Sequence, residues 1–199
     1  MPRRKRLERR DVIWAAARLL EEEGPAAFTL HQLARRLGIQ TPSLYNHIEG
    51  MAGLRADLAV LNAQKLADAM EQAAIGRSGA EALYAVAQAV RSYIKSSPVL
   101  YQFCLLSSGN QETPNKELKA AEERSLRVGL AIVQSFNLQG EDAVHALRGL
   151  RSLIHGFASL EAAGGFGMPL DCDDSFHRLL EAYSRGLADI ASAKDAAID

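Results

Sequence analysis

Apolar residues recur at helical spacing along most of the chain. In residues 8–23, Val12, Ala16, Leu19 and Leu20 fall on one side of a helix, because they follow one another at intervals typical of a 3.6-residue turn. No stretch shows the alternation of apolar and polar residues that is typical of strands. The pattern predicts an all-α protein of about nine helices. We expect them near residues 8–23, 29–37, 41–48, 51–76, 79–96, 100–105, 115–136, 141–163 and 173–193.

The start of the second predicted helix has two capping signals. Thr29 at the N-cap and Gln32 three residues later can satisfy each other's unpaired amides as a capping box. Phe28 before the cap and Leu33 after it are spaced to form a hydrophobic staple. These signals predict a helix that begins at Thr29.

A short turn separates this helix from the next one. Gly38 is placed to end the helix in a left-handed conformation, and Ile39 points back to the core. Thr41 as N-cap and Pro42 as first helical residue then start a second helix. Two helices of about nine residues with this hinge predict a helix-turn-helix.

The outer side of the second helix has an unusual composition. Leu44 and Ile48 point to the core, and the outside carries short hydrogen-bonding groups and an aromatic ring instead of Glu and Lys. Such groups read base edges and phosphates. The alternative is an ordinary surface helix. The outward candidates are Gln40, Thr41, Ser43, Tyr45, Asn46 and His47.

The formal net charge of −1 conceals an asymmetry. Residues 1–50 hold nine Lys and Arg against six Asp and Glu, whereas the remainder holds fourteen against eighteen. A basic end on an acidic body is typical of a protein that meets a polyanion with one domain. The N-terminal arm is either a strand that follows phosphates or a disordered solubilising tail. Its cations are Arg3, Arg4, Lys5, Arg6, Arg9 and Arg10.

Composition argues against several other classes of protein. No apolar run reaches the roughly 18 residues of a membrane span, and no apolar signal-peptide core follows the basic start. We therefore expect a cytoplasmic protein without a membrane partner. Cys104 and Cys172 are too isolated for a disulfide framework or a zinc site. The five histidines lack metal-ligand spacing, and there is no nucleophile elbow or phosphate-binding glycine loop, so we expect no enzyme, cofactor or metal.

Small residues line one side of the predicted helix 141–163. Gly149, Ser152, Gly156 and Ser159 follow one another at intervals of three and four. Two interior glycines destabilise a helix by about 1 kcal/mol each, so a second helix is expected to approach closely. That partner is either the same region of a second subunit or a helix of the same chain.

Residues 9–54 resemble the N-terminal domain of the tetracycline-repressor (TetR) family of bacterial transcription regulators. The resemblance rests on the segment from Arg9 to Gly24, on Phe28-Thr-Leu-His-Gln-Leu-Ala34, on Leu37-Gly-Ile39 and on Leu44-Tyr-Asn-His47. It implies that Thr29 and His47 hold phosphates, and that Tyr45 contacts the backbone and neighbouring bases. It also implies that Thr41, Pro42, Ser43 and Asn46 face the bases. The family often has a phosphate-binding Lys where this chain has Met51.

Residues 54–190 resemble a TetR C-terminal domain type named for a Trp-His-Gly (WHG) motif. The resemblance is strongest from Gly140 to Phe176 and includes Ile154-His-Gly156, where the motif Trp is Ile154. His155 is either a core histidine or a ligand or switch residue. In a family of two-fold dimers, helices 141–163 and 173–193 are expected to form the homodimer interface. The expected apolar face is Phe176, Leu179, Leu180, Tyr183 and Leu187.

These features together predict a DNA-binding domain over residues 1–53 and a helical dimerisation and effector-binding domain over residues 54–199. The predicted function is sequence-specific transcriptional regulation, as a ligand-responsive repressor that binds a palindromic double-stranded DNA operator as a homodimer. The alternative is a helical partner-binding module that has lost specific DNA binding, because of Met51. An unidentified small-molecule effector is expected beside Tyr93, Tyr101, Phe103, Phe136 and His155, although each of these is equally well explained as a core residue.

Overall fold

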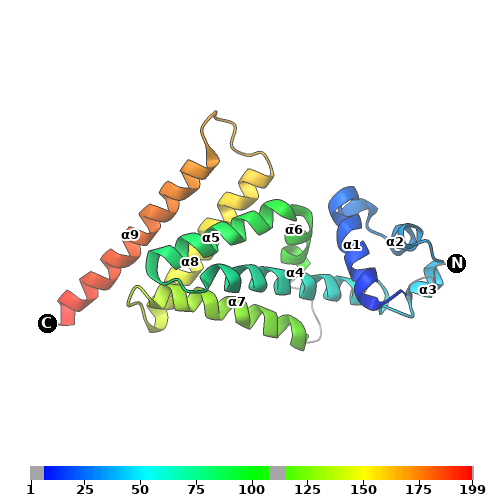
Figure 1. The fold of residues 1–199 in the computed structure, drawn as a ribbon, viewed down its shortest axis with the longest axis horizontal. Coiled ribbons are helices and arrows are strands. Elements are labelled where there is room, and N and C mark those ends of the chain that lie inside the picture. The colour runs from blue at the N-terminus through cyan, green and yellow to red at the C-terminus, as the bar shows by residue number, and fades with distance from the viewer. Residues whose placement is uncertain (1–6, 108–114, 199) are drawn as a thin grey trace. The chain divides into compact units, whose positions relative to one another are not determined.

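The computed structural model describes residues 7–107 and 115–198, and the side chains of residues 7–106 and 115–192 (Figure 1). Within these ranges the chain forms nine α-helices and one short 3₁₀ helix, and no strand. The all-α prediction is therefore confirmed. The elements are α1 (Arg9–Glu23), η1 (Pro25–Ala27), α2 (Leu30–Leu37), α3 (Thr41–Leu44), α4 (Gly50–Ala74), α5 (Gly79–Ser96), α6 (Pro98–Ser107), α7 (Lys116–Gln134), α8 (Gly140–Ala162) and α9 (Cys172–Ile198). None of the described helices is both long and apolar enough to traverse a bilayer.

The chain divides into two compact units. The first unit comprises residues 1–64 and 97–119, and the second comprises residues 65–96 and 120–199. This division differs from the predicted boundary at residues 53 and 54, because α6 and the first part of α4 pack with the N-terminal helices. The chain crosses between the units within α4, between α5 and α6, and within α7. The division into a DNA-binding and an effector-binding domain stays a functional prediction.

The first unit has its own apolar core. The predicted stripe of α1 is buried, and Leu33 of α2 and Leu44 of α3 pack with it. Leu100 and Cys104 of α6 belong to the same core. Phe103 meets Phe28 edge to face, with ring centroids 5.5 Å apart. Because α6 contributes side chains to this core, it is structurally part of the N-terminal unit.

The second unit is held by apolar packing of α5, α7, α8 and α9. Its buried residues include Leu83 and Val86 of α5, Val133 of α7 and Phe176 of α9. Removal of such side chains from water supplies most of the folding free energy of a helical bundle. Among the described residues, Ser184 and one buried cation are the exceptions to this apolar interior.

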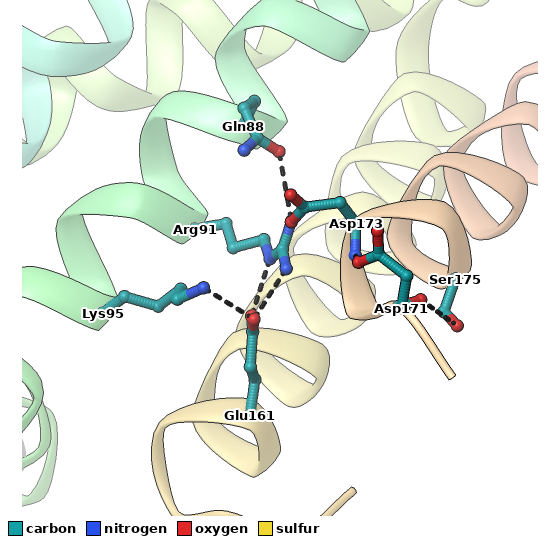
Figure 2. A network of polar contacts seen from close by, with 7 residues as sticks. All are labelled: Gln88, Arg91, Lys95, Glu161, Asp171, Asp173 and Ser175. Carbon is teal, nitrogen blue, oxygen red and sulfur yellow. Dashed lines mark hydrogen bonds and ion pairs between the residues drawn. The ribbon is translucent and has the colours of Figure 1, made fainter. Parts of the chain in front are cut away.

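That cation is Arg91 of α5, whose residue is 1 % exposed. Figure 2 shows its guanidinium facing Glu161 of α8 and Asp173 of α9. Nε and one terminal nitrogen each lie 2.7 Å from a Glu161 carboxylate oxygen, and the other terminal nitrogen lies 2.7 Å from Asp173. The rings of Phe157 and Phe176 lie 5.4 and 4.9 Å from the guanidinium carbon.

The contacts between Arg91 and Glu161 shift the pKa of both groups. The hydrogen bonds that Arg91 donates to Glu161 lower the pKa of that carboxyl, and the same bonds, together with the one to Asp173, raise the pKa of Arg91. Lys95, one turn later on α5, also lies 2.7 Å from Glu161. Breaking one partner of a buried ion pair is strongly destabilising, whereas a complete pair is close to neutral. We interpret this network (Arg91, Lys95, Glu161 and Asp173) as the connection that fixes the end of α5 to α8 and α9.

Candidate nucleic-acid interface

Helix α2 begins and ends at the predicted residues, although only the Thr29 half of the predicted capping box forms. Thr29 is the N-cap, and its hydroxyl accepts a hydrogen bond from the Gln32 amide at 3.2 Å. Gly38 has φ 67° and ψ 32°, the left-handed conformation that only glycine adopts without strain. The Ile39 amide donates to the Ala34 carbonyl at 3.1 Å, which satisfies a carbonyl at the end of the helix. The conformation of Gly38 and the hydrogen bond of the Ile39 amide therefore fix the turn between α2 and α3.

Helix α3 is shorter than predicted and begins one residue earlier. Its helical residues are Thr41–Leu44, and Gln40 is the N-cap, so the assignment of Thr41 as the cap was wrong. The amides of residues 45, 46 and 47 donate to carbonyls three residues earlier, which tightens the chain into successive turns. Gly50, at φ 67°, then leads into α4. The helix that was predicted to read the bases is therefore a single helical turn, Thr41–Leu44, extended by tight turns to His47.

The α3 region buries two side chains and leaves the others accessible. Leu44 and Ile48 are 0 % and 3 % exposed. Gln40, Pro42, Tyr45 and Asn46 are exposed, and Thr41, Ser43 and His47 are half-buried. None of the polar side chains here makes a hydrogen bond to another residue that the structure describes. The α3 edge (Gln40 to His47) therefore presents unpaired donors and acceptors on a backbone fixed by Leu44 and Ile48.

Several cations of the N-terminal unit are already paired. Arg9 lies 2.7 Å from Asp57 of α4, and Arg36 lies 2.6 Å from Glu22 of α1. The charge count of the sequence therefore overstates the positive charge that a polyanion would meet. Arg35 is exposed, and within residues 7–107 and 115–192 it forms no ion pair. The predicted arm residues Arg3, Arg4, Lys5 and Arg6 lie outside the described residues.

Met51 lies at the start of α4, where the related family often has Lys. Its side chain is partly buried and packs against the core of the first unit. The apolar replacement thus has a structural use. A phosphate anchor at this position is absent from the sequence.

The five predicted effector residues are divided between the two units. Tyr101 is 8 % exposed and belongs to the first unit with Phe103, whose ring contacts Phe28 and lies 5.2 Å from the Arg55 guanidinium. The other three positions are half-buried and belong to the second unit. They are Tyr93, Phe136 and His155. No single unit brings all five together, so this group stays a prediction.

The second unit contains a cavity of about 320 Å³ that the sequence reasoning missed. Leu138, Ala146 and Leu187 form apolar walls, and Asp142 and His145 add polar groups. The pocket is half open to solvent, and its volume lies at the lower end of the range for ligand sites. Helical periodicity gives no signal for such a cavity, because it forms between α8, α9 and the turn before α8.

The small-residue side of α8 has two different environments. A Cβ on Gly149 would lie 2.5 Å from the Tyr183 hydroxyl oxygen, which donates a hydrogen bond to the Ala146 carbonyl. Gly149 is therefore explained by close packing within one chain. A Cβ on Gly156 would meet nothing within 4 Å.

The expected apolar dimer face of α9 needs correction. Phe176, Leu180 and Leu187 are 1 to 2 % exposed and lie in the core of their own unit. They face inward because α9 covers α5 and α8, so they cannot meet a second subunit. Leu179 of the same set is 36 % exposed, and Leu160 of α8 is 52 % exposed.

Two known domain families match the sequence. Residues 12–58 match the family described as "Bacterial regulatory proteins, tetR family", and residues 83–183 match the family described as "Tetracyclin repressor-like, C-terminal domain". The HTH-type transcriptional regulator YobS of Bacillus subtilis is 32 % identical over 91 % of this chain and 93 % of its own length. The chain belongs to the TetR family.

Solved structures agree with this assignment. A protein from Rhodococcus sp. RHA1 superposes with a TM-score of 0.79 at 26 % identity, over 94 % of this chain and 99 % of its own. BioQ, solved with its double-stranded DNA operator, has a TM-score of 0.66 at 22 % identity, over 92 % and 99 % of the two chains. As a TetR-family member, the protein is a DNA-binding transcriptional regulator. Among its described residues, no group of His, Cys, Asp and Glu is arranged to hold a metal ion.

Proposed function

We propose that this regulator is a homodimeric repressor that acts in the bacterial cytoplasm on a palindromic operator and responds to a small molecule. The observation that carries the proposal is the α3 edge, where hydrogen-bonding side chains without partners among the described residues project from a backbone fixed by Leu44 and Ile48. BioQ, which shares the fold, was solved with its double-stranded DNA operator, and this supports operator binding by the present chain.

The side chains of the α3 edge would divide the work of recognition. Asn46 and Thr41 carry groups that can hydrogen-bond to base edges, and Pro42 and Ser43 lie beside them. Tyr45, whose residue is 60 % exposed, would contact the DNA backbone and neighbouring bases. Thr29 and His47 would bind phosphates. Gln40, the N-cap of α3, would also contact the DNA. Phosphate contacts fix the register, and base contacts give the specificity.

A two-fold dimer would present two α3 edges to a palindrome. Recognition helices must then lie about 34 Å apart, one turn of the duplex. We assign the interface to the outer faces of α8 and α9, where Leu160 and Leu179 are exposed and Gly156 leaves room for close approach.

The C-terminal domain would hold the effector. We propose that this domain is of the WHG type, that it binds a small molecule beside some of the aromatic residues predicted above, and that it carries out no catalysis and needs no cofactor or metal. The match over residues 83–183 supports a tetracycline-repressor-like domain in general.

Selection of bound fragments from random duplex DNA, followed by titration, tests the proposal. The purified protein should enrich one palindromic sequence. Asn46→Ala should weaken binding to it by about 1–3 kcal/mol and reduce base discrimination at one position of each half-site. Gln64→Ala, an exposed amide of α4 outside the α3 edge, is the matched control and should leave the affinity unchanged.

The salt dependence of this titration separates two outcomes. Specific binding should persist as salt rises, with a slope set by the number of phosphates contacted. Equal affinity for selected and random DNA at every salt concentration would favour the partner-binding module and contradict the repressor. A wild-type protein that stays monomeric at concentrations where it binds the palindrome would contradict the dimer.

A further inference from the structure

The cavity of about 320 Å³ in the second unit, here called the α8–α9 pocket, lies within that unit alone. Its apolar walls include Leu138, Ala146 and Leu187, which are 2 to 8 % exposed. The described residues that line it belong to the turn before α8, to α8 and to α9. A molecule in this pocket would therefore contact one helix pair of one unit.

The α9 side of the pocket combines a fixed ring with an open position. The Tyr183 hydroxyl donates a hydrogen bond to the Ala146 carbonyl, which holds the ring between the two helices. Gly186 also lines the pocket, and a Cβ built there would meet no atom within 4 Å. Glycine inside a helix is unfavourable relative to alanine. Close packing within the described chain explains Gly149, but it does not explain Gly186.

The polar part of the lining favours a positive charge. Among the described residues that line the pocket, Asp142 alone carries a formal charge when histidine is neutral. It is half-buried in the first turn of α8, and partial burial weakens the screening of its charge by water. A carboxylate has about four acceptor positions, so Asp142 can accept from a ligand in addition to any contact within the chain.

We propose that the α8–α9 pocket binds a small organic cation, in which an ammonium group lies at Asp142 and an apolar body lies against Leu138, Tyr183 and Leu187. The apolar body gains free energy by leaving water, and the charge-assisted hydrogen bond to Asp142 orients it. The open position at Gly186 leaves room for the body. The inference goes beyond the proposed function, because none of the five positions assigned to the effector lines this pocket.

The α8–α9 pocket is separate on α8 from the proposed dimer contact at Gly156 and Leu160. At 1.5 Å per residue, Ala146 lies about 15 Å before Gly156 along this helix. On α9 the pocket begins at Ala182, one turn after the exposed Leu179. A second copy of the chain is therefore the competing occupant, and the experiment below distinguishes the two.

Titration of the full-length protein with three probes, in the absence of DNA, tests the site. The probes are 2-phenylethylammonium, 2-phenylethanol and phenylacetate, which share an apolar body and are cationic, neutral and anionic. Nuclear magnetic resonance of the His145 imidazole, at the rim of the pocket, follows occupancy. The ammonium should bind saturably and about threefold to tenfold more tightly than the alcohol, and the carboxylate should bind most weakly. Absence of saturable ammonium binding, or equal affinity for the alcohol, would overturn the proposal.

Two pairs of variants locate the bound cation. Gly186→Leu fills the open position and should weaken ammonium binding at least about tenfold. Ala188→Leu adds the same side chain at an exposed position of α9 outside the lining and should bind as wild type does. Asp142→Asn should remove the preference for the ammonium over the alcohol, whereas Glu141→Gln, in the same helical turn, should keep it. Unchanged affinity in Gly186→Leu, or an unchanged preference in Asp142→Asn, contradicts the assignment.

Sedimentation of the same variants addresses the competing occupant. If Gly186→Leu becomes monomeric while Ala188→Leu stays dimeric, a second copy fills the pocket and the proposal is wrong. If Gly186→Leu fails to fold, Ile190→Lys replaces it, because Ile190 is 49 % exposed and a lysine there would compete with the ligand for Asp142. Since the titration contains no DNA, its failure leaves the proposed repressor standing, and a failure of operator binding leaves the pocket standing.

Discussion

The α3 edge and the Arg91 network treat polar groups in opposite ways. At the α3 edge, six polar side chains make no side-chain hydrogen bond to a described residue. In the network, one guanidinium meets two carboxylates at 2.7 Å and two aromatic rings, and its residue is 1 % exposed. The difference teaches what each region does with its polar groups: the network connects α5, α8 and α9 and is costly to break, whereas the polar side chains of the α3 edge remain available to a partner.

The strongest test of this comparison is Arg91→Met. The substitution leaves Glu161 without its main partner, so we expect a loss of about 3–5 kcal/mol in the free energy of unfolding. Urea unfolding followed by circular dichroism measures it. Asn46→Ala at the α3 edge should stay within about 0.5 kcal/mol of wild type. Similar losses for both variants would remove the distinction between the two regions.

A second test compares two glycines of α8. Gly149→Ala places a Cβ 2.5 Å from the Tyr183 hydroxyl and should destabilise the protein by about 1–3 kcal/mol. Gly156→Ala meets no atom within 4 Å and should stabilise the helix by about 1 kcal/mol. Thermal unfolding separates the two.

A related substitution tests the proposed dimer interface. In sedimentation experiments Gly156→Leu should weaken dimerisation, and an unchanged dimer would place the interface elsewhere.

A third test uses pH. The hydrogen bond from Arg91 lowers the pKa of Glu161 from its ordinary value of 4.5. A lowered pKa in the folded state stabilises the protein above about pH 4.5, and this contribution is lost as the pH falls toward the folded-state pKa. Urea unfolding between pH 7 and 3.5 should therefore show a steeper loss in wild type than in Glu161→Gln. Parallel curves would mean that the carboxylate is not held in this way.

The smallest expected effect is a steeper salt dependence of DNA binding in a variant at the start of α4. Met51→Lys would restore a cation at the start of α4, with its aliphatic stem still against the core. If the new ammonium reaches a phosphate, the slope of log affinity against log salt should become steeper by about 0.9. Fluorescence anisotropy at several salt concentrations measures the slope. An unchanged slope would show that this position does not approach the DNA.

Local signals in the sequence were sufficient to predict where the helix-turn-helix begins, turns and is buried. The Thr29 cap, the Gly38 turn and the buried Leu44 are each determined by a few neighbouring residues, and the structure confirms them. The length of α3 was wrong, because amides that bond three rather than four residues back still keep Leu44 and Ile48 on the inner side. Periodicity alone does not distinguish these two patterns.

Contacts between distant segments were outside the reach of the sequence. The pairing of Arg91 with Glu161 joins residues 70 positions apart, and Glu21 meets residues 78 and 79 positions later. Nothing in the local pattern of α6 indicates that it packs with α1 instead of with its sequence neighbours. For the same reason the effector residues were grouped by aromatic character, and the structure divides them between the two units.

The two thiols of the chain differ in a way that is useful at the bench. Burial raises the pKa of Cys104 to about 12, so almost none of it is thiolate at neutral pH, whereas Cys172 at the start of α9 is partly accessible. Since maleimides react with thiolates, a fluorescent dye should attach to Cys172 alone in the native protein. The unmodified gene product thus offers one selective labelling position per chain, and two dyes in an assembled pair could report distance by energy transfer.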